Sequence, residues 1–164
     1  MPKRYGKRKL GIGLAIIVTL IFVSPILSFV LEDHLFFKSN ATESLKEHSI
    51  ILQDDFKLES NKMTGIGDFY HRFDLEISES DKNRLTEWIL KSDNYKDSVP
   101  GIFDIRSDKP RYSDTEQEYI VTYEDKLNYV YEYYKPDKQG YSPTWDRISI
   151  SKKENELTYE RILD

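Results

Sequence analysis

The feature that most constrains this chain is a stretch from Leu10 to Leu31 that contains no charged residue. Its 22 residues would form a helix roughly 33 Å long at about 1.5 Å per residue. The hydrocarbon core of a bilayer is about 30 Å thick. The stretch therefore predicts one membrane-spanning helix.

The charges on either side of this stretch predict its orientation. Residues 1–9 contain five Lys and Arg residues and no Asp or Glu, whereas Glu32 and Asp33 follow the stretch directly. Basic residues beside a membrane helix favour the cytoplasmic side. We therefore expect a protein of the cell membrane with a basic cytoplasmic tail at 1–9, a single-pass signal-anchor helix at 10–31 and an extracytoplasmic domain.

A cleaved secretory signal peptide is the alternative interpretation, because it also combines a basic start with an apolar segment, here ending near Pro25. Cleavage needs small residues one and three positions before the cut. A cut after Ser28 would place Ile26 at the outer position, and a cut after Ser24 would place Phe22 there. The sequence favours the uncleaved anchor and leaves cleavage open.

Charge is divided unevenly along the chain. The whole chain has 24 Lys and Arg and 29 Asp and Glu residues. Five of the basic residues and none of the acidic ones precede Leu10, so the remainder has 19 basic and 29 acidic residues, a net charge of −10. Nucleic acids need Lys and Arg to neutralise their phosphates, and anionic lipid surfaces attract basic clusters. The acidic part argues against nucleic acid as a partner and against a flat orientation on the membrane.

The sequence also argues against several kinds of site. It has no Cys, which excludes disulfides, thiolate metal sites and a lipid anchor on cysteine. His34, His48 and His71 lack the spacing of metal ligands, and the chain has no HExxH or GxSxG motif and no complete phosphate-binding loop. We expect no cofactor and no metal, and no residue is assigned a catalytic role.

Two segments before the long middle loop have clear periodicity. Residues 32–53 are expected to form a membrane-proximal stalk with a short helix capped by Ser39 or Asn40. A short strand around Phe56 and Leu58 and a turn at 60–67 follow. In the clearest strand the residues of one face are Phe69, His71, Phe73, Leu75 and Ile77. Ser78 or Ser80 can cap the next helix, and we expect its Trp88 to pack on the sheet.

The C-terminal part predicts a meander of four antiparallel strands joined by short turns. The expected strands cover residues 119–124, 128–135, 145–151 and 157–162. With the two earlier strands this makes about six. The sequence therefore predicts an α+β fold, in which residues 54–164 form a small two-layer domain with a mostly antiparallel sheet packed on one helix.

Two features are candidates for a recognition surface. The segment from Asp93 to Gln117 is long for a connection, and long loops are often functional. Tyrosines recur on one face of the strand at 128–135, and such rigid amphipathic rings suit protein or sugar binding, although Tyr also favours strands for structural reasons. The candidate binding residues are Ile102, Phe103, Tyr129, Tyr131, Tyr133 and Trp145.

Three functions are compatible with these features. The favoured one is a non-enzymatic protein-binding or envelope accessory module with a protein partner outside the cytoplasm, for example an immunity-type protein whose acidic charge steers it to a basic toxin. The second is a small envelope hydrolase that uses His71 with a nearby carboxylate, although a structural histidine at the edge of the core is the favoured interpretation of His71. The third is a structural subunit of a membrane assembly.

Overall fold

The computed structural model describes residues 36–65, 69–97, 118–136 and 143–163. The expected cytoplasmic tail and transmembrane helix, at residues 1–9 and 10–31, lie outside these ranges. Within them, neither helix has the length and hydrophobicity needed to cross a bilayer.

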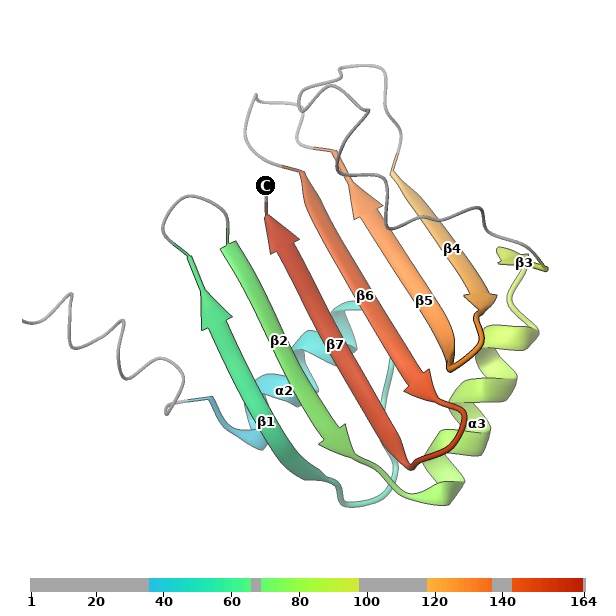
Figure 1. The fold of residues 1–164 in the computed structure, drawn as a ribbon, viewed down its shortest axis with the longest axis horizontal. Helices are drawn as coiled ribbons and strands as arrows, with labels where there is room; N and C mark the ends of the chain where they lie inside the picture. Colours follow the sequence, from blue (N-terminus) through green and yellow to red (C-terminus); the bar gives the residue numbers. More distant parts are fainter. Residues whose placement is uncertain (1–35, 66–68, 98–117, 137–142, 164) are drawn as a thin grey trace, which may run out of the picture. The chain divides into compact units, whose positions relative to one another are not determined.

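The described residues form an α+β domain, with two helices and a mixed sheet of seven strands (Figure 1). In chain order the elements are α2 (Lys38–Glu47), β1 (Lys57–Thr64), β2 (Phe69–Glu76), α3 (Glu79–Leu90), β3 (Tyr95–Lys96), β4 (Tyr119–Glu124), β5 (Asn128–Lys135), β6 (Thr144–Ser151) and β7 (Glu156–Leu163). The spatial order is β1-β2-β7-β6-β5-β4-β3. All neighbouring strands are antiparallel except β3 and β4.

This order follows from how the chain connects its strands. β4 to β7 form the predicted antiparallel meander, because short links let consecutive strands pair. β7 also pairs with β2 and so joins the meander to the β1–β2 hairpin. Between β2 and the opposite edge of the sheet the chain passes through α3. A parallel pair cannot be joined by a tight hairpin turn, and β3 and β4 are joined by the long segment 97–118.

Alternation along the strands gives the sheet two faces. The core on the helix-covered face includes Phe73, Leu75, Ile148, Ile150, Leu157 and Tyr159 from the sheet, with Ala41 and Leu45 from α2 and Leu85 and Ile89 from α3. The rings of Phe73 and Tyr159, which are partners in the β2–β7 ladder, stack with their centroids 4.7 Å apart. In Figure 1, α2 lies behind the sheet, so the viewer looks onto the opposite face.

The start of α3 confirms the predicted cap. Ser78 precedes the helix, and its Oγ accepts a hydrogen bond of 3.0 Å from the backbone N–H of Asp81. The Asp81 carboxylate in turn accepts hydrogen bonds from the backbone N–H groups of Gln53 and Asp54. The first turn of α3 is therefore hydrogen-bonded, through Asp81, to the segment that follows α2.

Three sequence predictions about the fold were wrong in detail. The sheet has seven strands rather than six, because β3 pairs two residues of the expected loop with β4. Two helices pack on the sheet rather than the one that was predicted, because α2 also lies against it. The turn predicted at 60–67 begins too early: β1 continues to Thr64, because pairing with β2 outweighs the turn preference of Ser60 and Asn61.

Candidate functional site

The predicted binding residues that the structure describes lie on two faces of the sheet. Tyr129, Tyr131 and Tyr133 share the helix-covered face of β5, and Tyr131 is only 4% exposed because Trp88 of α3 stacks on it at 5.5 Å between ring centroids. This contact confirms that Trp88 packs on the sheet. Trp145 lies on the opposite face, as the partner of Tyr134 in the β5–β6 ladder.

The other two predicted binding residues, Ile102 and Phe103, lie outside the described residues. The expected recognition role of the loop that contains them therefore stays a prediction.

A buried polar cluster lies beneath α2, and the sequence analysis missed it. The Asp146 carboxylate accepts hydrogen bonds from Arg161, at 2.7 Å from Nε and 2.8 Å from Nη2, and one of 3.3 Å from the Tyr159 hydroxyl. His48 Nε2 lies 3.0 Å from the other side of the same carboxylate. Burial alone would raise the pKa of Asp146, but the hydrogen bonds from Arg161 and the contact with His48 hold it below its usual value. Asp146 is therefore a buried carboxylate in its charged form.

This cluster attaches α2 to the sheet. His48 directly follows the helix, and its ring lies against those of Tyr131, Tyr133 and Tyr159, with centroids 5.4 to 6.1 Å away. Glu47 adds a second ion pair, at 2.5 Å from Arg161 Nη2. No spacing in the sequence could have revealed this cluster, because its members come from α2, β6 and β7. Its groups are occupied with one another, as expected of a structural role.

His71, the residue of the hydrolase alternative, occupies the helix-covered face of β2. It is 6% exposed, and its ring lies between those of Phe69, Phe73 and Tyr159. Its Nε2 lies 2.8 Å from Oδ1 of Asn61 on the neighbouring strand β1. This environment resembles the expected histidine at the edge of the core, with a side-chain amide as its partner.

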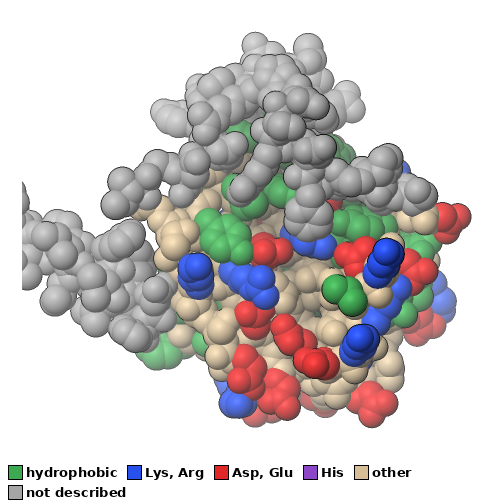
Figure 2. All heavy atoms as spheres, viewed as in Figure 1, with side chains coloured by type: hydrophobic (Ala, Val, Ile, Leu, Met, Phe, Trp, Pro, Cys, Tyr) green, Lys and Arg blue, Asp and Glu red, His purple; other side chains and the backbone are tan. Residues whose placement is uncertain are grey.

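The opposite face of the sheet carries a row of alternating charges. Arg72, Glu160, Arg147 and Glu132 are successive partners on β2, β7, β6 and β5, with nitrogen to oxygen distances of 3.6 to 3.8 Å. Figure 2 shows acidic and basic side chains interspersed on this face. Because each charge faces an opposite one, the row is largely self-neutralised and offers little net charge to a partner.

Glu132, at the end of that row, is the most unusual of these groups. It is 0% exposed; its Oε1 accepts a hydrogen bond of 2.7 Å from the Tyr123 hydroxyl, and its Oε2 has no hydrogen-bond partner among the described residues. Burial raises the pKa of Glu132, and Tyr123 and Arg147 only partly oppose that effect. Its neighbours Val121 and Val130 are also buried, so this end of the row belongs to a second, smaller core.

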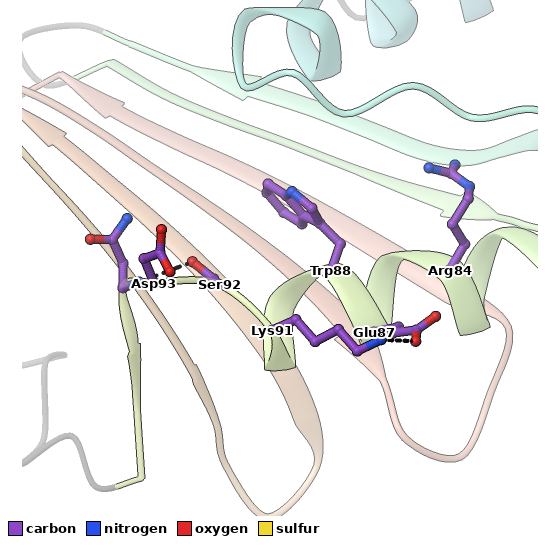
Figure 3. A pocket seen from close by; sticks show the side chains of 7 residues that line it. Arg84, Glu87, Trp88, Lys91, Ser92 and Asp93 are labelled. Carbon is purple, nitrogen blue, oxygen red and sulfur yellow. Dashed lines mark hydrogen bonds and ion pairs between the residues drawn. The ribbon is translucent and has the colours of Figure 1, made fainter.

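Among the described residues, two shallow grooves are open to solvent. One, of about 550 Å³, is lined by Glu59, Glu76, Glu154, Asn155 and Glu156, and thus by β1, the end of β2 and the turn into β7. The other, of about 530 Å³, lies at the end of α3 and is lined by Arg84, Glu87, Trp88, Lys91, Ser92, Asp93 and Asn94 (Figure 3). Both are open surface features rather than enclosed cavities.

Two lysines lie beside the acidic groove, and Lys82 Nζ donates a hydrogen bond of 2.7 Å to the backbone carbonyl of Glu154. Lys57 pairs with Glu59 at 2.7 Å, and no ion pair occurs at Glu76, Glu154 or Glu156 among the described residues. Throughout the described residues, no three His, Asp or Glu side chains are arranged to hold a metal ion. A carboxylate-lined groove of this kind suits basic side chains of a partner.

Comparisons with protein-family models, with curated proteins and with solved structures gave no match.

Proposed function

We propose that this protein is a non-enzymatic accessory module, held in the membrane by the expected helix at residues 10–31, that binds a basic protein outside the cytoplasm. The proposal rests on the acidic domain and on one structural observation: the groove in which Glu59, Glu76, Glu154 and Glu156 converge. Complementary charge steers protein association and disfavours partners of like charge.

The state of the polar groups supports binding over catalysis. His48 and Asp146 are buried and engaged within the cluster beneath α2, and His71 is enclosed by aromatic rings beside Asn61. A general acid or base must come within about 3 Å of the substrate proton, directly or through one water. The hydrolase alternative would therefore require these side chains to leave the core first.

Site-specific photo-crosslinking in native membranes tests the proposal. A photoreactive residue at position 154 would probe the acidic groove, and the same residue at Glu43, an exposed position on α2, would serve as the control. We expect position 154 to capture one reproducible protein with a basic surface, and we expect high salt to reduce the yield because screening weakens surface electrostatics.

A charge-reversal variant makes the result specific. With the photoreactive residue kept at position 154, the double substitution Glu76→Lys and Glu156→Lys should abolish the crosslink, whereas Glu43→Lys should leave it intact. Equal capture by the groove variant, or capture of an acidic protein, would contradict the proposal. Replacing residues 10–31 with an unrelated anchor then separates it from the membrane-assembly alternative, in which function would be lost although the domain remains folded.

A further inference from the structure

We infer that the groove at the end of α3 is an anchor site for an arginine side chain of the basic partner. This inference rests on the proposed function and adds to it a specific contact, which shares no lining residue with the glutamate-lined groove. Three features of the groove support the inference: the indole ring of Trp88, the unpaired polar groups next to it and the charge of the groove.

Trp88 provides a fixed aromatic surface. Its indole stacks on Tyr131 with an interplanar angle of 29°, yet Trp88 remains 38% exposed while Tyr131 is buried. Figure 3 shows the indole projecting from α3 toward the sheet, between Arg84 on one side and Ser92 and Asp93 on the other. A ring held by packing loses little entropy when a ligand covers its open side.

The polar groups next to this ring are available. Among the described residues, neither the Asp93 carboxylate nor the Asn94 side-chain amide has a hydrogen bond or an ion pair; Asn94 makes only backbone contacts, to Ser92 Oγ and to the N–H of Thr122. A carboxylate accepts up to four hydrogen bonds, and an amide both donates and accepts. They supply acceptors for a multivalent donor beside the indole.

The two cations of the groove are already neutralised. Arg84 Nη2 lies 2.5 Å from the Asp81 carboxylate and also donates to the carbonyl of Ile51, and Lys91 pairs with Glu87 one helical turn earlier. The remaining unpaired charge is that of Asp93, which is negative. The groove therefore favours a cation over an anion.

Arginine fits these features better than other ligands. Its planar guanidinium stacks on an aromatic face and donates up to five hydrogen bonds, which the carboxylate and amide oxygens can accept. Trp and Arg are also the residues most enriched at the energetic centres of protein interfaces. A neutral sugar could stack on the indole and donate hydroxyl hydrogen bonds to Asp93, but it would gain no ion pair from Asp93 or from the acidic domain.

The test uses the full chain in detergent, with the Trp145→Phe substitution so that Trp88 is the only tryptophan. The probe is a short, otherwise uncharged peptide with one arginine, and the control peptide has citrulline, which keeps the shape but not the charge. We expect saturable quenching or a spectral shift of Trp88 with the arginine peptide at millimolar concentrations, and no saturable response to the citrulline peptide or to maltose.

Two further substitutions in this background test the role of Asp93. Asp93→Asn should weaken the arginine response about threefold or more, the size expected for loss of one exposed charge-assisted contact. Glu43→Gln removes the same unit of charge from α2 and should leave the response unchanged. An equal response to citrulline, a response to maltose alone, or an equal loss in both variants would overturn the inference, as would no response.

The peptide titration and the crosslinking experiment test the arginine site and the accessory role separately. Failure of the arginine peptide together with specific capture from position 154 would overturn the arginine site and leave the accessory role in place. Specific binding of the arginine peptide without any captured protein would leave the site and overturn the accessory role.

Discussion

Replacing Asp146 by Asn tests the idea that the buried cluster holds α2 on the sheet. The change keeps the shape of the side chain but removes the charge that Arg161 and His48 face. Removing one partner of a buried ion pair costs about 3–5 kcal/mol when the other charge is left without compensation. Here Arg161 is 24% exposed at its side chain and keeps Glu47 as a partner. We therefore expect a smaller loss in the free energy of unfolding, about 2 to 3 kcal/mol at neutral pH.

The same reasoning predicts how this loss depends on pH. The pKa of Asp146 is lowered in the folded protein, so its charged form contributes stability above the unfolded-state value of about 3.9. That contribution disappears as the pH falls through the lower folded-state pKa. The difference in stability between the original protein and Asp146→Asn should accordingly shrink as the pH is lowered from about 5 toward 2.

Urea unfolding of the full chain in detergent, followed by tryptophan fluorescence at several pH values, measures both effects. Asp55→Asn is a matched control, because Asp55 also forms an ion pair of 2.7 Å, with Lys38, but its side chain is 91% exposed. It should leave the unfolding midpoint nearly unchanged. An Asp146→Asn variant as stable as the original protein at neutral pH, or a loss that persists undiminished in acid, would refute the reasoning.

The other predictions concern single packing or hydrogen-bonding features and use the same urea titration. Glu132→Gln should be more stable than the original protein at neutral pH, and the difference should grow as the pH increases above about 4.3. The reason is that the raised pKa of the buried Glu132 makes its ionisation in the folded state unfavourable. A lower stability of the variant at neutral pH would mean that the ion pair of Glu132 with Arg147 dominates. Phe73→Ala should cost about 3–5 kcal/mol, because the fully buried ring leaves a cavity and loses its stacking on Tyr159, and a loss under about 1 kcal/mol would contradict the described core. Ser78→Ala should cost about 1 kcal/mol through loss of the α3 cap, whereas Ser78→Gly should cost only a few tenths relative to the original.

Local signals in the sequence were enough for much of the fold. The alternation at residues 69–77, the four C-terminal strands and the capped helix after Ser78 were all predicted, and the structure confirms them within one or two residues. These features depend on side chains that are neighbours in the sequence, such as alternating residues of a strand or a cap and the N–H three residues later. The β1 strand was cut short in the prediction because its continuation depends on a partner strand, which overrides the local turn preference.

The tyrosines of β5 show where local reasoning ends. Their spacing placed Tyr129, Tyr131 and Tyr133 on one face, and that was right. Whether that face binds a partner or faces the core depends on which side the helices cover. Trp88 covers Tyr131, so this tyrosine belongs to the core, while Trp88 itself remains partly exposed.

By itself, the sequence determined the uncharged stretch at 10–31, the acidic balance after it and the order and type of most elements, because these are properties of composition and of short-range periodicity. Only the tertiary structure decided which residues meet across the domain. His48 reaches a tyrosine 83 positions away and Arg161 reaches Glu47 across 114 positions. Such contacts depend on the register and stacking of whole strands and helices, and no local pattern encodes them. The acidic groove arises in the same way, from side chains of separate segments, whereas the groove at the end of α3 is lined by residues of one segment, 84–94.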